Sequence, residues 1–595
     1  MPYKNYVLVC GGTGCVSNKA DAIYHNLVRE VENRNLTADV QVVRTGCFGF
    51  CEKGPIVKIL PEEAFYVEVK PEDAAELISE HIVKGRIVER LRYKDSESKQ
   101  HAKVEDISFY QKQFRIVLRN CGVINPEDIG EYIARDGYAA LEKVLFEMKP
   151  QDVINELKVA GLRGRGGAGF PTWMKWTFSI QVNDEPKYVV CNADEGDPGA
   201  YMDRSVLEGD PHSVIEGMMI CGHTVGAHQG ILYVRAEYPL AIHRLEVAIR
   251  QAKESGLLGK DILGSGFDFD LEIRLGAGAF VCGEETALLA SVQGERGMPK
   301  PRPPFPAVKG LWNKPTVINN VETWANIPVI LTRGGSWFAK IGTEKSKGTK
   351  VFALTGKISN SGLVEVPMGT PLRDIVYSIG GGIPNGKKFK AVQTGGPSGG
   401  VIPAEYLDTP IDYEHLQQLG SIMGSGSMIV MDEDDCMVDI AKFYFGFTID
   451  ESCGKCAPCR IGGRKVHNIL SRITQGNGIQ EDIDTMKRIG QAMQRASLCG
   501  LGQTAPNPVF STLRYFEDEY VAHIEHGKCP AGKCKSLIVY KILEDKCIGC
   551  GLCARRCPVD AITGEKRKPH VIDPATCIKC GECYTVCKFD AVTRG

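Results

Sequence analysis

The stretches CIGCGLCARRCP, Cys547 to Pro558, and CIKCGECYTVCK, Cys577 to Lys588, decide the fold of the C-terminal end. Both space four cysteines as C-x2-C-x2-C-x3-C, in a chain of 595 residues with 23 cysteines. The start, MPYKNYVLVC, has no basic region and no cleavage pattern, so we expect no export and a cytoplasmic location. In that setting, tight cysteine groups bind metal rather than form disulfides. Zinc pairs two ligands with two, so runs of four favour iron–sulfur clusters over zinc knuckles.

The paired runs resemble the bacterial two-cluster ferredoxin, in which the fourth cysteine of each run ligates the other cluster. Lys588 stands where that family usually has proline, and proline ligates nothing. We therefore expect a ferredoxin domain over residues 541–595 with two [4Fe–4S] clusters. The resemblance implies Cys547, Cys550, Cys553 and Cys587 for one cluster, and Cys577, Cys580, Cys583 and Cys557 for the other.

A third group joins ESCGKCAPCR to SLCGLG about 40 positions later. Its cysteines are Cys453, Cys456, Cys459 and Cys499. Three closely spaced thiolates and one remote thiolate suit a [4Fe–4S] cluster between helices, in a helical domain over residues 436–526. A structural zinc ion is the alternative.

A fourth group lies near the N-terminus, as Cys10-x4-Cys15 and Cys47-x3-Cys51. Residues 1–95 read as a small α/β unit with strands at 6–10, 40–45 and 56–60 and a helix at 20–33. Two pairs of thiolates suit a [2Fe–2S] cluster, with zinc as the rival. The segment resembles the thioredoxin-like [2Fe–2S] ferredoxins, and the polar stretch at 94–103 reads as a linker.

The remaining cysteines divide into two kinds. His523, His526, Cys529 and Cys534 give H-x2-H-x2-C-x4-C, which predicts a zinc-braced hinge over residues 527–540; a plain surface turn is the alternative. The others stand alone in apolar or Gly-rich settings and read as packed thiols. They are Cys121, Cys191, Cys221, Cys282 and Cys436.

The stretch GLRGRGGAGFPTWMKW, Gly161 to Trp176, contains G-x-G-x-x-G. A dinucleotide fingerprint follows a strand, whereas VINELKVAGL before this loop reads as helix. The glycines still let backbone N–H groups approach a phosphate, and Arg163, Arg165 and Lys175 add positive charge. A Gly-rich loop without a ligand is the alternative.

Three further segments favour a ligand-binding loop over a loop without a ligand. They are CNADEGDPGAYMDR from Cys191, GAGAFVCGEETALL from Gly276, and KPRPPFPA with PTVINNVET from Lys300 and Pro315. With the Gly-rich loop they closely resemble the NADH- and FMN-binding subunit of respiratory complex I. The whole chain more narrowly resembles the beta subunit of electron-bifurcating [FeFe] hydrogenases, which carries both flanking cluster domains in this order. ESCGKCAPCR with SLCGLG is that family's flavin-proximal cluster motif.

The resemblance implies roles for individual residues. FMN and its phosphate are held by Gly164, Arg165, Gly166, Gly167 and Lys175. The flavin and ribityl chain contact Asn192, Asp194, Glu195 and Gly196. The pocket is lined by Phe280, Gly283, Glu284 and Glu285, with Asn319, Asn320 and Thr323 near the phosphate. Phe170, Phe178 and Phe305 stack the dinucleotide. Glu285 accepts from a ribose hydroxyl, which favours NAD(H). Asp197, near the nicotinamide, and Arg302 stand where the family more often has Glu and Lys.

We therefore predict a multidomain α/β chain: a thioredoxin-like [2Fe–2S] domain (1–95), a Rossmann-like FMN and NAD(H) domain (105–335), a β-grasp domain (336–435), the helical [4Fe–4S] bundle and the ferredoxin domain. Lys plus Arg is 71 and Asp plus Glu is 73, which argues against a nucleic-acid binder. No apolar run approaches the roughly 20 residues that span a bilayer.

The expected function is electron transfer between NAD(H), ferredoxin and a partner hydrogenase through FMN, one [2Fe–2S] and three [4Fe–4S] clusters, with no protein acid or base required. Expected partners in a hetero-oligomer are the hydrogenase catalytic subunit, a small thioredoxin-like [2Fe–2S] subunit and ferredoxin. The alternatives are a subunit of a formate dehydrogenase or a ferredoxin transhydrogenase, or a scaffold with an empty nucleotide site.

Overall fold

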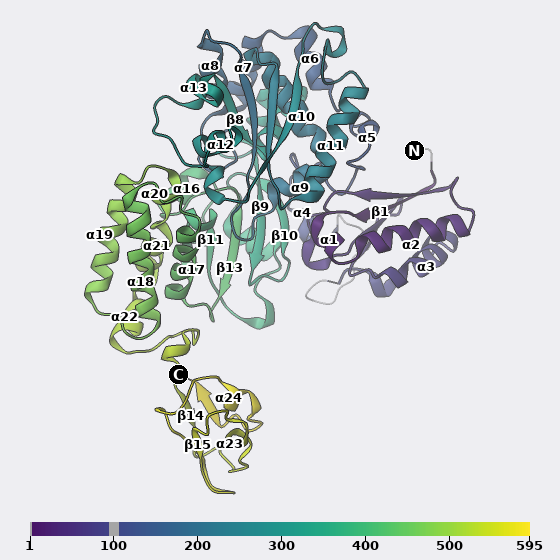
Figure 1. Cartoon of the computed structure of the whole chain (residues 1–595). Helices are drawn as coiled ribbons and strands as arrows, with labels where there is room; N and C mark the ends of the chain where they lie inside the picture. Colours follow the sequence, from purple (N-terminus) through teal and green to yellow (C-terminus); the bar gives the residue numbers. More distant parts are fainter. Residues whose placement is uncertain (1–2, 95–105, 595) are drawn as a thin grey trace. The chain divides into compact units, whose positions relative to one another are not determined.

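The computed structural model describes residues 3–94 and 106–594, in two compact units over residues 1–430 and 431–595. The predicted linker at 94–103 falls almost wholly outside the described residues. Within them, no helix is long and apolar enough to cross a membrane. Figure 1 shows the elements in sequence colours.

The N-terminal domain is built on a four-stranded sheet in the order β2-β1-β3-β4. β1 (Asn5–Cys10) runs parallel to β2 (Val40–Thr45) and antiparallel to β3 (Val57–Leu60), which pairs with β4 (Ala64–Tyr66). The predicted helix is α2 (Ala20–Asn33), which buries Ile23, Leu27 and Val31 at helical spacing. The first two cysteines lie at the end of β1 and in α1 (Thr13–Ser17), and the other two follow β2.

The largest domain contains a parallel sheet of β5 (Tyr188–Ala193), β6 (Gln229–Arg235), β7 (Asp270–Gly276) and β8 (Thr316–Asn320). Their order is β7-β6-β5-β8, so the winding reverses between β5 and β8. The sheet is flanked by helices (Figure 1). They include α7 (Pro150–Ala160), α8 (Thr172–Gln181), α9 (Met202–Gly209), α10 (Pro211–Val225), α11 (Pro239–Glu254), α12 (Glu285–Val292) and α14 (Val321–Arg333). Ligands of such sheets bind at the carboxyl ends of the strands, at the reversal.

The predicted β-grasp region forms a mixed five-stranded sheet in the order β10-β9-β13-β11-β12. Its strands are β9 (Thr349–Gly356), β10 (Gly362–Pro367), β11 (Phe389–Thr394), β12 (Gly400–Pro403) and β13 (Ser427–Asp432). Phe352, Val364 and Val392 from three of these strands are buried in one hydrophobic core with Ile375, which belongs to the helical turn Asp374–Ile379.

The second unit begins with a helical bundle. It comprises α17 (Met437–Asp450), α18 (Gly463–Thr474), α19 (Glu481–Ala496), α20 (Gly500–Thr504), α21 (Asn507–Tyr515) and α22 (Glu517–Glu525), packed around Phe445, Leu470 and Met486. The C-terminal domain repeats one motif twice. Each half has a short helix, α23 (Leu552–Arg556) or α24 (Glu582–Val586). Two short antiparallel strand pairs complete the domain: β14 (Tyr540–Ile542) pairs with β17 (Val592–Arg594), and β15 (Ile562–Thr563) pairs with β16 (Val571–Ile572).

Candidate functional site

The carboxyl ends of β5 and β8 bring two asparagines together, since Asn192 and Asn320 are direct partners across the ladder. The Asn192 amide donates to the carbonyl of Gly283 (2.9 Å) and accepts from the N–H of Asp194 (3.1 Å). The reversal in the sheet therefore gathers three of the segments that sequence analysis singled out.

The Gly-rich loop lies between α7 and α8, so the predicted helical context is confirmed. Gly167 has a φ of +120°, a conformation that L side chains rarely adopt. A Cβ on Gly166 would stand 3.2 Å from the Cβ of Asn320, so glycine permits this close approach to β8. The N–H of Arg165 donates to the hydroxyl of Thr323 (2.9 Å). A bare backbone cradle beside a helix start fits the phosphate of FMN.

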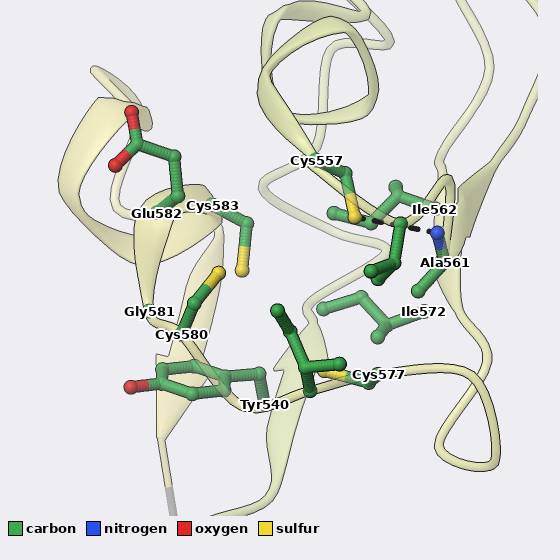
Figure 2. A pocket seen from close by; sticks show the side chains of 12 residues that line it. Tyr540, Cys557, Ala561, Ile562, Ile572, Cys577, Cys580, Gly581, Glu582 and Cys583 are labelled. Carbon is green, nitrogen blue, oxygen red and sulfur yellow. Dashed lines mark hydrogen bonds between the residues drawn. The ribbon is translucent and has the colours of Figure 1, made fainter.

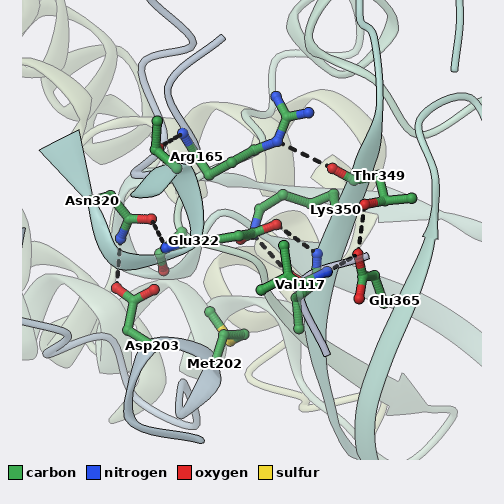
Figure 3. A network of polar contacts seen from close by, with 12 residues as sticks. Val117, Arg165, Met202, Asp203, Asn320, Glu322, Thr349, Lys350 and Glu365 are labelled. Atoms are coloured by element: carbon green, nitrogen blue, oxygen red, sulfur yellow. Dashed lines mark hydrogen bonds and ion pairs between the residues drawn. The ribbon is translucent and has the colours of Figure 1, made fainter. Parts of the chain in front are cut away.

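The side chain of Arg165 does not serve the predicted phosphate role. Its guanidinium is fully buried and donates to the backbone carbonyls of Arg163 and Lys347. A third bond goes to the carbonyl of Thr349 (Figure 3). The Arg163 guanidinium pairs with Glu414 at 2.6 Å. Arg163 and Arg165 therefore hold the loop to the neighbouring domain, which supplies acceptors that the buried Arg165 guanidinium requires. Lys175 is the predicted cation that remains, and its ammonium donates to the carbonyl of Ile318 (3.0 Å).

Several residues predicted to contact the flavin or line its pocket also cap the N-terminal ends of helices. The Glu195 carboxylate accepts from the N–H groups of residues 202, 203 and 204 and thereby caps α9. Glu284 caps α12, and the Asn320 side chain caps α14. Capping groups satisfy N–H groups that the first turn of a helix leaves free. These residues therefore shape the pocket even where they do not touch a ligand.

Lys350, Glu322 and Asp203, which were not among the predicted site residues, form a buried charge network close to the Gly-rich loop. Lys350 forms an ion pair with Glu322, and the Asn320 amide donates to the carboxylate of Asp203 (Figure 3). Burial is the main cause that raises the pKa of Glu195 to about 7, and burial with the nearby Glu195 and Glu322 raises the pKa of Asp203 well above its usual value. No local spacing in the sequence connects Lys350, Glu322 and Asp203, because they come from three separate elements, β9, α14 and α9.

The residues predicted to bind the nucleotide combine charge with exposed rings. Glu285 pairs with Arg302 (2.6 Å) and lies 3.7 Å from the ammonium of Lys175. The Asp197 carboxylate accepts from the Ser425 hydroxyl (2.6 Å), and burial raises its pKa to about 6. Three predicted stacking rings are exposed to solvent: Phe170 (41%), Phe178 (40%) and Phe305 (54%). Exposed aromatic faces are suited to stacking flat ligands.

Other predicted pocket residues support this arrangement. Phe280 and Gly283 belong to a short turn before α12, and a Cβ on Gly196 would stand 2.8 Å from the Phe280 ring. The buried Asp194 carboxylate lies 3.6 Å from Arg235. Asn319 is buried and accepts from the Trp176 indole when its amide is oriented for hydrogen bonding. The side chain of Asn319 therefore serves the scaffold.

The N-terminal cysteines meet at one point of their domain. Thiol contacts join Cys10 to Cys15 and to Cys47, and the sulfurs of Cys47 and Cys51 are 3.9 Å apart. The thiols come from β1, α1 and the loop after β2. Four thiols gathered in this way fit a [2Fe–2S] cluster.

The helical-domain cysteines share one end of the bundle. The Cys459 sulfur lies 3.3 Å from the hydroxyl of Ser452. Burial raises the pKa of the Cys459 thiol, and the nearby thiols of Cys456 and Cys453 raise it further. Cys499 begins α20, in which a Cβ on Gly502 would stand 2.9 Å from the Cβ of Cys459. The remote cysteine therefore begins a helix that packs against Cys459 of the predicted group.

The C-terminal domain contains two hollows, each lined by four cysteines. One hollow is lined by Cys577, Cys580, Cys583 and Cys557 (Figure 2). The other is lined by Cys547, Cys550, Cys553 and Cys587. Each set takes three cysteines from one run and the fourth from the other run, which is the grouping that the resemblance to two-cluster ferredoxins implies.

The predicted zinc group requires a correction. The structure gathers Cys436, His523, Cys529 and Cys534, all buried, with their ligand atoms within 4.8 Å of one another. Cys436, which we interpreted as a packed thiol, takes the place predicted for His526, an exposed residue. The His523 Nδ1 faces the carbonyl of Glu519 (2.6 Å), and its Nε2 faces the sulfur of Cys534 (3.3 Å). Cys436 lies 87 positions before His523, so local spacing could not reveal it.

Five segments match known families. Residues 2–81 match the thioredoxin-like [2Fe–2S] ferredoxin family, and residues 157–329 the Nuo51 FMN-binding domain. Residues 351–402 match the SLBB domain, residues 439–523 the NADH-ubiquinone oxidoreductase-F iron–sulfur binding region, and residues 546–591 the 4Fe–4S dicluster domain. The fold prediction, with its FMN and cluster domains, is therefore confirmed.

Curated relatives cover most of the chain. The NADP-reducing hydrogenase subunit HndC of Solidesulfovibrio fructosivorans is 59% identical over 77% of this chain and 94% of its own length. A subunit of the NADH-quinone oxidoreductase of Rhizobium meliloti is 45% identical over 70% of this chain and 99% of its own length. A crystal structure of an NAD+-reducing [NiFe]-hydrogenase covers 88% of this chain and 85% of that one, with 29% identity and a TM-score of 0.62. The chain belongs to the family of FMN-binding, NADH-oxidising iron–sulfur subunits that includes HndC and its counterparts in NADH-quinone oxidoreductases.

Proposed function

We propose that the chain exchanges electrons between NAD(H), ferredoxin and a partner hydrogenase, with electron bifurcation at one flavin. The observation that carries the proposal is the combination of one flavin pocket with four separate cysteine groups in a single chain. FMN, when bound, exchanges a hydride with the nicotinamide and single electrons with iron–sulfur clusters. Two terminal cluster domains provide two branches for those electrons.

In this proposal the protein binds and orients rather than supplying an acid or base. The Gly-rich loop holds the flavin phosphate with backbone N–H groups, with Lys175 as the cation beside it. Phe170, Phe178 and Phe305 stack the dinucleotide and exclude water. Asn192 joins the flavin segment to the turn before α12 and so fixes the pocket's width.

The partner assignment rests on the relatives. HndC is named as a subunit of a hydrogenase, and it is 59% identical to this chain. We therefore propose a hydrogenase catalytic subunit, a small thioredoxin-like [2Fe–2S] subunit and ferredoxin as partners. The catalysis on hydrogen would then lie outside this chain. A formate dehydrogenase or a ferredoxin transhydrogenase complex is the alternative, which identification of copurified proteins decides.

The choice of nucleotide depends on Glu285. A carboxylate at the ribose favours NAD(H) and repels the 2′-phosphate of NADP(H). Arg302 and Lys175 partly neutralise this carboxylate, and HndC is named as NADP-reducing. NADP(H) is therefore the second candidate, and comparing kcat/KM for the two nucleotides separates them.

We also propose that Cys436, His523, Cys529 and Cys534 bind zinc. Three thiols and one imidazole match a closed structural site. The Glu519 carbonyl orients the imidazole through Nδ1, as outer partners of zinc ligands do. The site would join the start of α17 to the segment that leads into the ferredoxin domain.

The flavin-proximal role of the third group is tested by Cys499→Ala in the full chain, purified without oxygen. NADH-dependent dye reduction should survive, because the nucleotide and flavin pocket is unchanged. Electron transfer to ferredoxin should stop, because the first cluster beyond the flavin is lost. Ferredoxin reduction at the wild-type rate would contradict the proposed path.

A further inference from the structure

The loop that carries Cys47 packs directly on the flavin-binding domain. A Cβ on Gly46 would collide with the Cα of Gly209, at the end of α9, so only backbone fits here. On the other side, the Gly49 carbonyl accepts from the N–H of Leu363 in β10 (2.7 Å). The loop is therefore held between two domains, and Figure 1 shows α1 close to α9.

A buried carboxylate binds the start of α1, the helix that contains Cys15. Glu208 of α9 accepts from the N–H of Thr13 (3.0 Å) and from the Thr13 hydroxyl. Thr13 begins α1, which contains Cys15 and has no capping side chain from its own N-cap residue, Gly12. Glu208 thus supplies from the flavin-binding domain the acceptor that a capped helix normally carries itself.

A buried cation reaches the same place from α11. The Arg244 guanidinium is fully buried, donates to the carbonyl of Glu208 and lies 3.4 Å from a carboxylate oxygen of Glu127. Among the described residues, its Nη2 has no hydrogen-bond partner. That nitrogen stands 3.0 Å from the Cβ position of Gly11, the residue after Cys10.

A buried donor without a partner is costly, so an anion beside it is strongly favoured. An iron–sulfur cluster held by four thiolates is anionic, and reduction adds another electron. A nearby buried cation favours the more negative state, and the effect is strong because water does not screen it. A cation at this position therefore raises the reduction potential of the cluster.

We propose that α9 and α11 dock the N-terminal [2Fe–2S] domain, with Glu208 as a positioning residue and Arg244 as the cation that raises the potential of its cluster. This rests on the proposed function, in which Cys10, Cys15, Cys47 and Cys51 are one of the four cysteine groups and hold a [2Fe–2S] cluster. The same α9 is capped by Glu195 of the flavin segment. One short helix therefore links the flavin pocket to the cluster loop.

The test is an EPR-monitored redox titration of the full chain carrying Arg244→Met. The [2Fe–2S] potential should shift to a more negative value, while FMN content and NADH-dependent dye reduction stay unchanged. Arg250→Met is the matched control, because Arg250 lies on the same helix with an exposed side chain paired with Glu254. Arg244→Lys, which keeps the charge, should retain most of the wild-type potential.

Thr13→Val keeps the test decisive if Arg244→Met does not fold. This substitution removes the hydrogen bond from the Thr13 hydroxyl to Glu208. It should shift the [2Fe–2S] potential to a more negative value, by less than Arg244→Met does. Equal potentials in the wild type and the folded variant would overturn the inference while leaving the proposed function intact. A wild-type chain with FMN but no [2Fe–2S] signal would instead contradict the cluster assignment.

Discussion

The ferredoxin domain and the flavin pocket store their functional information in different ways. In the ferredoxin domain, eight cysteines at fixed spacing line two hollows. Each cysteine is one of the four predicted ligands of its cluster. In the flavin pocket, four distant segments meet at a strand reversal, and many of their polar side chains serve helices or loops. A site encoded by spacing fails through a single change, whereas a distributed site loses its function by degrees.

The largest effect is expected in the ferredoxin domain. Cys577→Ser should remove one [4Fe–4S] cluster, about four of the roughly 14 iron atoms per chain, because the hollow loses one thiolate. Transfer to ferredoxin should stop while NADH-dependent dye reduction continues. Iron and sulfide analysis with EPR measures the loss, and Cys221→Ser, at an isolated buried thiol, should keep all the iron. Full iron content in Cys577→Ser would refute the ligand set.

The zinc group, like the flavin pocket, brings together residues from distant parts of the chain. Cys436→Ser should abolish bound zinc and lower the melting temperature, because metal binding contributes folding free energy. Metal analysis by mass spectrometry and calorimetry measure both quantities. His526→Ala is the control, since this exposed residue lies outside the group. Zinc retained in Cys436→Ser, or lost in His526→Ala, would restore the original prediction.

A graded effect is expected in the flavin pocket. Glu285→Ala should raise KM for NADH by about tenfold, because a charged hydrogen bond to a ribose hydroxyl is worth about 1.5 kcal/mol or more. FMN should stay bound, and the preference for NADH over NADPH should fall. Glu295→Ala is the control, since that exposed carboxylate pairs with Lys300. An unchanged KM would remove Glu285 from the ribose site.

The smallest effect is a pH dependence from Asp197. Burial raises the pKa of its carboxyl to about 6 in the folded chain, against about 3.9 when unfolded. The folded state therefore binds this proton more tightly, and the stability it contributes is lost as the pH rises from about 4 to about 6. Asp197→Asn should raise the melting temperature near pH 8, with the gap shrinking toward pH 5. A gap that is constant with pH would contradict the raised pKa.

Prediction from sequence succeeded where the chemistry is local. The cysteine runs fix their loops, because three of the four cysteines of each set lie a few residues from one another; the exchange of the fourth cysteine between the runs came from the resemblance to two-cluster ferredoxins. The helical context of the Gly-rich loop was also readable from the pattern of VINELKVAGL. The role of Arg165 was not, because its carbonyl acceptors come from residues 347 and 349 and depend on tertiary packing. Cys436 and Lys350 were missed for the same reason.

The central claim is that one flavin pocket passes electrons from a dinucleotide to thiolate-bound iron within this chain. The most direct measurement is stopped-flow absorbance with freeze-quench EPR on the full chain, purified without oxygen and mixed with NADH. The account predicts bound FMN whose visible absorbance bleaches, followed by signals of reduced iron–sulfur clusters. A chain that binds no FMN, or whose flavin bleaches while every cysteine group holds zinc, would contradict it.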